Sequence, residues 1–267
     1  MQPQELAEAL RERPFAALTG AGVSTRSGIP DYRGQGAPKP LRGPMRWQSF
    51  RDDPLARQRY WARAFVGWPR FRGAKPNAAH FSLAAFEKAT RLTGLVTQNV
   101  DALHEAAGSS APVKLHGDLS RAVCLSCGTP ITRVEVHAGL AELNPGFEAE
   151  LGALRPDGDI EIAEELVASF RLLPCAVCGG PLKPDVVFFG DSVPDETKVR
   201  ARAVVDAAQD LLVVGSSLAV GSARALCRRA TRLWIVNLGP TSFDARAHRR
   251  VDAEAGEFLS AVQRELG

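Results

Sequence analysis

Four of the five cysteines form two C-x-x-C pairs, Cys124 with Cys127 and Cys175 with Cys178. In a reducing compartment such pairs favour metal binding over a disulfide framework, because each pair chelates one edge of a tetrahedral Zn²⁺. Four thiolates leave no coordination position open for water or substrate. We therefore predict one structural zinc ion that does no chemistry. The fifth cysteine, Cys227, is expected to be a buried structural thiol.

A glycine-rich segment, Gly20-Ala21-Gly22, follows a predicted strand, where a tight turn lets backbone N–H groups meet a pyrophosphate. It departs from the dehydrogenase fingerprint, because Thr25 replaces the third glycine and no acid follows at the usual distance of about 20 residues. Taken alone, the glycines fit an ordinary tight turn equally well. The polar loop that follows brings an acid, an aromatic residue and an arginine together in Asp31-Tyr32-Arg33. This pattern argues against hydride transfer.

A second polar segment, Gln98-Asn99-Val100-Asp101, follows the predicted strand at 92–97, where open α/β sheets keep their ligands. These side chains could hold a carboxamide or a ribose, whereas the alternative reading makes Asn99 a helix N-cap. His116 comes next, just before the cysteine module, and imidazole is the usual general base. A lone histidine is more often structural, but its place after two ligand-like loops favours a catalytic role. For His104 we expect the structural role.

Two later segments, Gly215-Ser216-Ser217 and Asn237-Leu238-Gly239, also stand at predicted strand ends. The first could hydrogen-bond a phosphate or a ribose, and the asparagine could hold a ribose hydroxyl. Each could equally be a simple turn.

Positioning these segments requires a sheet. Short apolar runs at 15–19, 92–97, 186–189, 211–215 and 233–237 have strand length, and helical spacing marks 77–90, 195–208 and 220–229. Strands that alternate with helices predict an α/β fold with a Rossmann-like parallel sheet and helices on both faces. Glycine and proline crowd 34–44, which suits a loop that moves when a cofactor binds.

Length and composition limit the class of protein. A chain of 267 residues with 45% hydrophobic and 24% charged residues is typical of a globular protein with one large and one small domain. No block of Lys and Arg indicates nucleic-acid binding, and no apolar run approaches the roughly 20 residues of a membrane span. The N-terminus resembles neither a secretory signal nor a transit peptide, so we expect a cytoplasmic protein.

The motifs taken together, from Gly20-Ala21-Gly22-Val23-Ser24 through Gln98-Asn99-Val100-Asp101, Leu115-His116-Gly117 and both cysteine pairs to Gly215-Ser216-Ser217 and Asn237, resemble the sirtuins. The resemblance runs in order from about residue 15 to residue 258. Residues 57–68, 155–159 and 183–191 look closest to class II, the mitochondrial sirtuin-4 type, and the lack of a transit peptide suggests a bacterial relative.

The resemblance implies an NAD-dependent lysine deacylase that acts on acyl-lysine proteins or peptides. The acyl carbonyl oxygen would attack the ribose carbon as nicotinamide leaves, Asn99 and Asp101 would hold the nicotinamide, and the base His116 would drive collapse of the alkylimidate. The products would be lysine, nicotinamide and O-acyl-ADP-ribose. The NAD contacts implied are Gly20, Ala21, Gly22, Thr25, Ile29, Asp31, Tyr32, Arg33, Gln98, Asn99, Val100, Asp101, Gly215, Ser216, Ser217, Asn237, Leu238, Gly239 and Ala255.

The domains that follow are an NAD-binding domain made of 1–50, 73–120 and 184–267, a helical insertion at 51–72 and a zinc-binding module at 121–183. The substrate peptide would add as a strand beside Val187, Phe188 and Phe189, between the two domains, and we expect a monomer that binds neither nucleic acid nor membrane.

Tyr60 and Arg63 match a Tyr-x-x-Arg pair that contacts acidic acyl chains in class II relatives. The alternative is a helix that packs Tyr60 and leaves Arg63 in solvent. If Arg63 faces the pocket, its guanidinium favours a carboxylate on the acyl group, so we predict deacylation beyond acetyl.

Two other functions remain open at this point. A protein mono-ADP-ribosyltransferase would use the same nicotinamide-leaving step but add mass to its target. An inactive acyl-lysine or NAD-binding module would release no nicotinamide.

Overall fold

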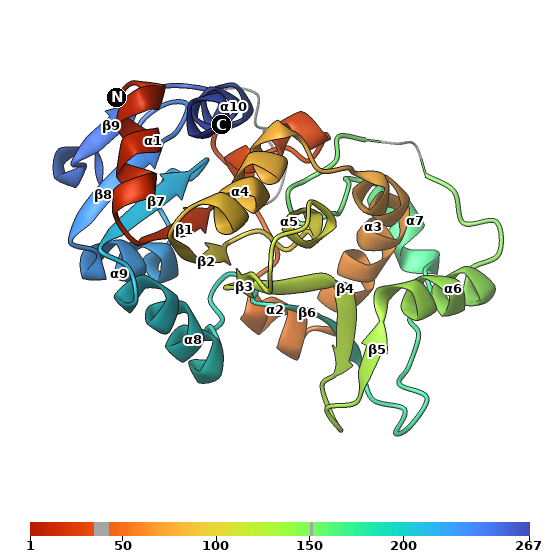
Figure 1. Ribbon diagram of the computed structural model, residues 1–267. Coiled ribbons are helices and arrows are strands. Elements are labelled where there is room, and N and C mark those ends of the chain that lie inside the picture. The colour runs from red at the N-terminus through yellow and green to blue at the C-terminus, as the bar shows by residue number, and fades with distance from the viewer. Residues whose placement is uncertain (35–42, 150–151) are drawn as a thin grey trace. The chain divides into compact units, whose positions relative to one another are not determined.

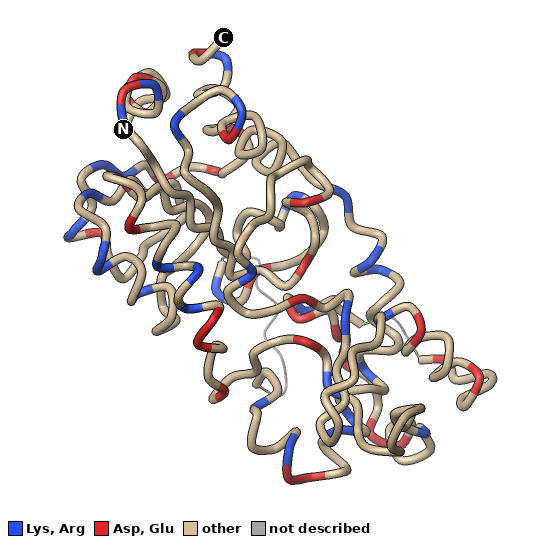
Figure 2. Tube along the Cα trace, turned by 60° about the horizontal axis from the view of Figure 1, so that its bottom comes forward, with Lys and Arg blue, Asp and Glu red and all other residues tan. Residues whose placement is uncertain are grey.

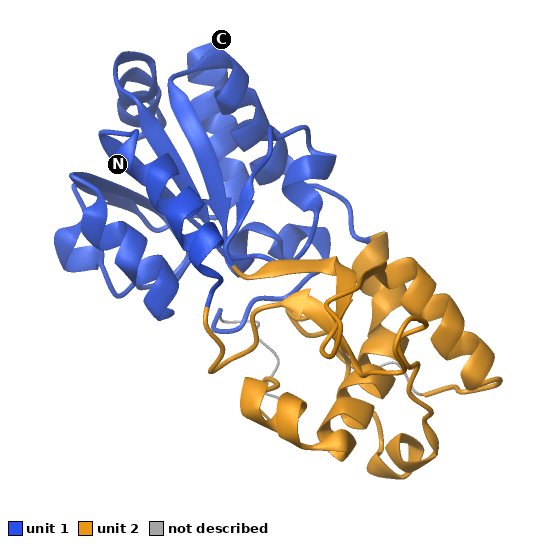
Figure 3. Ribbon diagram, turned by 90° about the horizontal axis from the view of Figure 1, so that it is seen from below, with its two compact units in different colours: residues 1–37, 74–115, 193–267 blue, residues 38–73, 116–192 orange. Residues whose placement is uncertain are grey.

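The computed structural model describes residues 1–34, 43–149 and 152–267, so most of the 34–44 loop predicted to move lies outside the described residues. The chain divides into two compact units (Figure 3): unit 1 is Met1–Ala37, Ala74–Leu115 and Val193–Gly267, and unit 2 is Pro38–Gly73 and His116–Ser192. The segments 51–72 and 121–183 both fall in unit 2. Unit 2 also takes 38–50, residue 73, 116–120 and 184–192, which we assigned to the large domain from the sequence.

Unit 1 is built on a six-stranded sheet whose strand order is β3-β2-β1-β7-β8-β9 and whose pairings are all parallel (Figure 1). The strands are β1 Phe15–Thr19, β2 Leu92–Thr97, β3 Val113–Lys114, β7 Asp210–Val214, β8 Arg232–Val236 and β9 Arg249–Val251. The order runs outward in both directions from β1, which pairs with β2 on one side and with β7 on the other. This reversal is the topological switch point at which open α/β sheets bind ligands.

Helices cover both faces of this sheet, as the alternation of elements predicts. The helices of unit 1 are α1 Pro3–Glu12, η1 Ala21–Val23, η2 Thr25–Ser27, α4 Ala78–Ala89, α5 Leu103–Ala106, α8 Asp195–Asp206, α9 Gly221–Arg229, η3 Asp244–Arg246 and α10 Ala255–Leu266. On one face, Leu10 of α1, Phe86 of α4 and Leu259 of α10 bury their side chains with Phe15 and Leu212 of the strands. Helices α8 and α9 lie against the other face (Figure 1).

Unit 2 holds a three-stranded antiparallel sheet with the order β5-β4-β6, and helices. Its elements are α2 Trp47–Asp52, α3 Pro54–Gly73, β4 Gly117–Cys124, β5 Pro130–Thr132, α6 Arg133–Leu143, α7 Glu164–Ser169 and β6 Leu182–Val186. The aromatic residues of α3 are packed, because the buried Arg133 guanidinium lies 4.8 Å from the ring centroid of Trp61 and 5.1 Å from that of Trp68. Such cation–π contacts are attractive and offset part of the cost of burying the guanidinium.

Local signals fix the ends of several helices. The side chain of Asn77 accepts a hydrogen bond from the backbone N–H of Ala79 at the start of α4. Thr132 and Glu135 exchange bonds in a capping box at the start of α6, and Pro54 opens α3, where its missing N–H costs nothing.

The strands and helices predicted in unit 1 form within two residues of their predicted ends. The prediction of a parallel strand at 186–189 is wrong. β6 ends at Val186 and pairs antiparallel with β4, and the chain then turns so that Asp191 N donates to Phe188 O. A short apolar run does not reveal which sheet it joins, because that depends on partners distant in sequence.

Acidic and basic residues are interspersed along the traces of both units (Figure 2). Among the described residues, no helix combines the length and the apolar character that crossing a membrane requires.

Candidate active site

Two glycine-bearing turns of unit 1 pack backbone against backbone at the switch point. Gly20 N donates to Val214 O at 3.1 Å, and Gly22 N donates to Gly215 O at 2.9 Å. A Cβ on Gly20 would lie 2.8 Å from Gly215 O, and a Cβ on Gly215, whose φ is +60°, would lie 2.5 Å from Val23 N. Because no side chain fits between the turns, the glycines here do more than form an ordinary turn.

Gln98 joins three strand ends. Its backbone N–H and its side-chain amide both donate to Thr19 O, at 3.0 and 3.2 Å, and the amide also donates to Ser216 Oγ at 2.8 Å. The ends of β1, β2 and β7 are thus linked by one side chain, and the predicted NAD contacts Gly20, Gln98 and Ser216 are brought together.

Asn99 and Asp101 meet on the hydroxyl of Ser24, which follows η1. Asn99 Nδ2 donates to Ser24 Oγ at 3.0 Å, and Ser24 Oγ donates to Asp101 Oδ2 at 2.9 Å. Asp101 Oδ1 accepts from Leu103 N at 3.1 Å. Asp101 therefore supplies the cap-type bond before α5, so the reading of Asn99 as the N-cap is wrong.

Burial from solvent changes the acid–base behaviour of this cluster. Asn99 and Asp101 are 8% and 6% exposed, and burial raises the pKa of the Asp101 carboxyl, against the opposing effect of its bonds from Leu103 and Ser24. Burial also lowers the pKa of two histidines beneath the cluster, His80 to about 4 and His104 to about 3. Both imidazoles are neutral near neutral pH.

The polar loop after η1 carries five predicted NAD contacts. Thr25 Oγ1 donates to Gly22 O at 3.0 Å, Ile29 is buried, and Asp31 Oδ1 accepts from Gly34 N at 2.7 Å. Tyr32 and Arg33 are exposed. The loop therefore returns toward the first turn at Thr25 and presents its aromatic and basic side chains to solvent.

The last predicted contacts line the ends of β7 and β8 and the start of α10. Asn237 is buried and donates to the carbonyls of Leu238 and Gly239, whose φ is +84°. Leu238 is 64% exposed, Ser217 O accepts from Ser242 N, and Ala255 is the first residue of α10.

His116 belongs to unit 2, at the entry to β4. Its carbonyl accepts from Val187 N at 2.9 Å, and the next residue, Gly117, has φ +86° and would place a Cβ 2.1 Å from Asp185 O. The close pairing of β4 with β6 thus fixes the backbone that carries the imidazole.

The four paired cysteines form one cluster in unit 2, with all four Sγ atoms within 4.8 Å of one another. Cys124 and Cys178 lie 3.5 Å apart and Cys127 and Cys175 3.8 Å apart, and none is in a disulfide. Zn–S bonds of about 2.3 Å in a tetrahedron give S–S separations of about 3.8 Å, so the donor set fits a zinc ion. Gly128 N and Gly179 N close a turn after each pair. The fifth thiol, Cys227, is fully buried as expected, and burial raises its pKa to about 12.

Tyr60 and Arg63 are both buried in α3, so the alternative that left Arg63 in solvent is wrong. Arg63 Nε donates to Ile160 O at 3.1 Å, and the guanidinium pairs with Asp159 at 3.4 Å. The ring of Tyr60 packs against those of Phe50 and Phe188, and burial raises the pKa of its phenol, which stays protonated.

The predicted peptide-binding residues follow β6. Val187 is half-buried, Phe188 is buried against Phe50 and Tyr60, and Phe189 is 37% exposed. β6 is at the edge of its sheet, and an edge strand is the geometry that accepts an added peptide strand.

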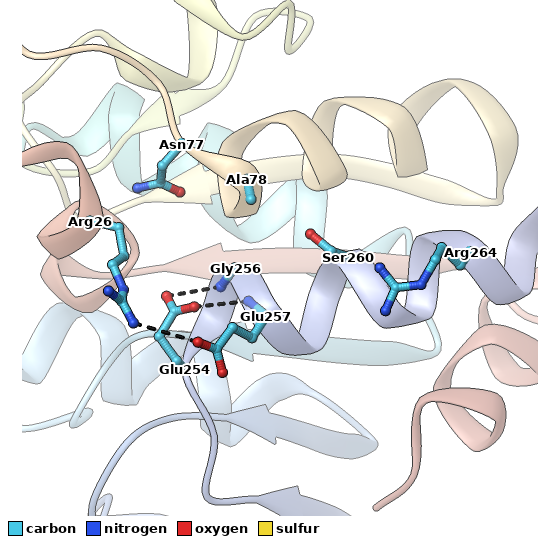
Figure 4. A pocket seen from close by; sticks show the side chains of 8 residues that line it. All are labelled: Arg26, Asn77, Ala78, Glu254, Gly256, Glu257, Ser260 and Arg264. Carbon is cyan, nitrogen blue, oxygen red and sulfur yellow. Dashed lines mark hydrogen bonds and ion pairs between the residues drawn. The ribbon is translucent and has the colours of Figure 1, made fainter.

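A separate cavity of about 580 Å³ lies in unit 1 beside α4 and α10 (Figure 4). It is lined by Arg26, Asn77, Ala78, Glu254, Gly256, Glu257, Ser260 and Arg264. Glu254 caps α10 by accepting from Gly256 N and Glu257 N, and Arg26 pairs with Glu257 at 3.5 Å. Both carboxylates of the cavity, those of Glu254 and Glu257, thus already have partners. None of the predicted NAD contacts lines the cavity, although Ala255 lies between two lining residues.

Sequence reasoning missed Ser24, Thr19, Thr97 and His80, which hold the polar cluster. Ser24 stood within the quoted motif, so a buried hydroxyl beside the glycine turn was a usable signal. His80 lies 24 residues before His104, and only the fold brings the two rings to 4.8 Å.

Family models, curated relatives and solved structures all indicate the same protein family for this chain. Residues 20–222 match the model of the Sir2 family. The chain is 48% identical over 266 residues to the NAD-dependent protein deacetylase 1 of Streptomyces coelicolor, covering 98% of this chain and 89% of that one. It is 44% identical to the mitochondrial NAD-dependent protein lipoamidase sirtuin-4 of Bos taurus, covering 98% and 87%. A solved structure of Sir2 bound to acetylated peptide superposes with a TM-score of 0.79 at 30% identity, covering 99% and 98%.

Proposed function

The chain belongs to the Sir2 family and is an enzyme of the sirtuin type, and we propose that it removes acyl groups from protein lysines in an NAD-dependent reaction. In this proposal one water molecule is consumed as the acyl group passes to ADP-ribose, and the products are nicotinamide, free lysine and O-acyl-ADP-ribose.

The observation that carries the proposal is the buried cluster of Ser24, Asn99 and Asp101 at the switch point of unit 1. It offers an amide and a carboxylate held by a shared hydroxyl, which is complementary to the donor and acceptor of a carboxamide. Preorganised polar groups in a dry site act on a reacting group more strongly than they would in water.

In this reaction the residues of the chain perform three tasks. Asn99 and Asp101 hold the nicotinamide, the turns at Gly20 and Gly215 admit the pyrophosphate close to the backbone, and His116 takes a proton from a ribose hydroxyl. NAD supplies the electrophilic ribose carbon. The zinc ion holds the cysteine module together, because its four thiolates leave no place for a reactant.

We further propose that the enzyme accepts acyl groups beyond acetyl and that Asp159 limits its use of acidic ones. The Arg63 guanidinium, which would favour an acyl carboxylate, already pairs with Asp159 at 3.4 Å, and both side chains are less than 10% exposed. An acidic acyl chain would have to compete with this internal carboxylate.

A panel of acetyl, methylglutaryl and lipoyl lysine peptides, read by nicotinamide release, tests both parts. We expect turnover that His116→Tyr abolishes, and Asp159→Asn should raise kcat/KM for the methylglutaryl peptide by about tenfold relative to acetyl, about the value of one charged hydrogen bond. Arg63→Lys is the matched control, since it keeps the charge but loses the planar fork.

Retained turnover in His116→Tyr would contradict the mechanism. Acetyl-lysine as the best substrate would contradict the broad acyl range, and an unchanged acyl preference in Asp159→Asn would contradict the role of Asp159. Mass spectrometry of the peptide separates loss of an acyl group from gain of ADP-ribose.

A further inference from the structure

We propose that His104 is a positioning residue for Asn99 and acts through the hydroxyls of Thr19 and Thr97. This inference rests on the proposed function and adds to it a residue that the sequence indicated only as structural.

Two threonine side chains connect the imidazole of His104, through a chain of hydrogen bonds, to the backbone of the segment that carries Asn99. His104 Nε2 lies 2.9 Å from Thr19 Oγ1, Thr19 Oγ1 donates to Thr97 Oγ1 at 2.9 Å, and Thr97 Oγ1 accepts from Asn99 N at 3.1 Å. All three side chains are at most 1% exposed. Thr19 ends β1 and Thr97 ends β2, so the chain crosses the sheet where the strands stop.

The surroundings of the ring favour one tautomer of His104. With Thr19 as the donor to Thr97, its single hydroxyl proton is used, and the Thr19 oxygen accepts from His104 Nε2. His104 is therefore neutral with its proton on Nε2. Its Nδ1 is buried, and no partner for it occurs in the part of the chain that the structure describes. The ring thus contributes one directed bond, and that bond starts the chain.

A second histidine supports the side chains of the same segment. His80 Nδ1 accepts from Asn77 N at 3.3 Å, and His80 Nε2 lies 3.5 Å from Ser24 Oγ, to which Asn99 Nδ2 donates. The rings of His80 and His104 are 4.8 Å apart. The two imidazoles thereby support Asn99 from two directions, one through its backbone and one through its side chain.

Loss of the His104 bond should therefore misplace Asn99 without removing it. Displacements of a fraction of an ångström in a catalytic group lower turnover far more than they lower binding of remote parts of a substrate. We expect an effect on kcat for nicotinamide release and little effect on KM for the acyl peptide.

The test compares two substitutions of unequal chemistry. His104→Gln keeps an N–H near the place of Nε2 and should stay within about threefold of wild-type kcat, whereas His104→Leu should lower kcat by about 10- to 100-fold. Adding Thr19→Val to His104→Leu should lower kcat little further, because both substitutions break the same series of hydrogen bonds. Leu83→Val, a core substitution in α4 of the same unit, is the matched control and should leave kcat unchanged well below the melting temperature.

Amide hydrogen exchange at Asn99 gives a readout that does not depend on turnover. Exchange should be faster in His104→Leu and Thr19→Val than in wild type and Leu83→Val. If His104→Leu kept the kcat and the Asn99 exchange rate of the wild type, the proposal would be overturned. It would also be overturned if His104→Gln lost as much kcat as His104→Leu. If the wild type released no nicotinamide, the proposed function would fail while the exchange at Asn99 would still test His104. If His104→Leu does not fold, the comparison of His104→Gln with Thr19→Val decides.

Discussion

At the scale of single residues, the candidate site depends on hydroxyl and imidazole groups that take no part in the proposed reaction. The Ser24 hydroxyl accepts a hydrogen bond from Asn99 and donates one to Asp101. The Thr97 hydroxyl accepts a hydrogen bond from the backbone N–H of Asn99. These bonds are buried, so each unmade bond would leave a desolvated polar group, which is costly. The residues proposed to bind nicotinamide are therefore held in place by short polar side chains as much as by hydrophobic packing.

The two buried histidines should make stability depend on pH. Their pKa values in the folded state, about 4 for His80 and about 3 for His104, are lowered by burial from 6.5. Below pH 6.5 the unfolded chain gains protons that the folded chain cannot, so stability is full above pH 6.5 and is lost as the pH falls.

From pH 6.5 to pH 5 each histidine should cost about 2 kcal/mol of unfolding free energy. Urea titrations at a series of pH values measure this, and His104→Gln should flatten the profile by that amount. Leu83→Val, which changes the core but no titratable group, is the control and should leave the pH dependence unchanged. Equal acid sensitivity in His104→Gln and wild type would contradict the assignment.

At the scale of elements, the site exists because loops after β1, β2 and β7 meet where the strand order reverses. Gln98 bonds to the other two loops, and Gly20, Gly22 and Gly215 let them approach to backbone contact. Parallel strands bring their carboxyl ends to one edge, so segments nearly 200 residues apart in sequence form one surface.

Gly215→Ala tests this close approach. The added Cβ would meet Val23 N at 2.5 Å on a backbone with φ +60°, so we expect a loss of roughly 2 to 4 kcal/mol in unfolding free energy and a weaker affinity for NAD. Urea unfolding and calorimetric titration with NAD measure the two effects.

Gly221→Ala in the first turn of α9 is the matched control, because a Cβ there has no neighbour within 4 Å. It should be neutral or slightly stabilising. If both variants behaved alike, the close packing of the two turns would not explain the glycine at 215.

At the scale of the whole molecule, the chain combines a sheet unit with a large apolar core and a smaller unit whose sheet has three strands. Small units of this kind commonly depend on a metal for stability. The cysteine cluster joins the turn after β4 to the turn before β6, so a zinc ion would tie the ends of the long segment between them.

Removal of zinc should therefore loosen unit 2 selectively. After treatment with a chelator, we expect hydrogen exchange to accelerate within 117–186 while β1, β2 and β7 stay protected. Metal analysis should find one zinc per chain, lost in Cys127→Ser and retained in Cys227→Ala, whose thiol lies outside the cluster. Uniform acceleration across both units would contradict this view.

The sequence by itself determined the family, the α/β fold, the main strands of unit 1 and the zinc donor set. These depend on local signals: apolar periodicity, glycine turns, C-x-x-C spacing and motifs in a fixed order. The same signals predicted which loops carry polar groups, because a loop that ends a parallel strand must lie at the ligand edge of the sheet.

Only the tertiary structure decided which partners these groups take. Periodicity could not tell that β6 pairs antiparallel with β4, that Arg63 is buried against Asp159, or that His104 reaches Asn99 through two threonines. Each of these arrangements depends on a contact between residues at least 58 positions apart, whereas propensity and spacing report only on neighbours along the chain. Hydrogen bonds and burial are properties of that long-range packing, and they determine how the predicted site residues are held.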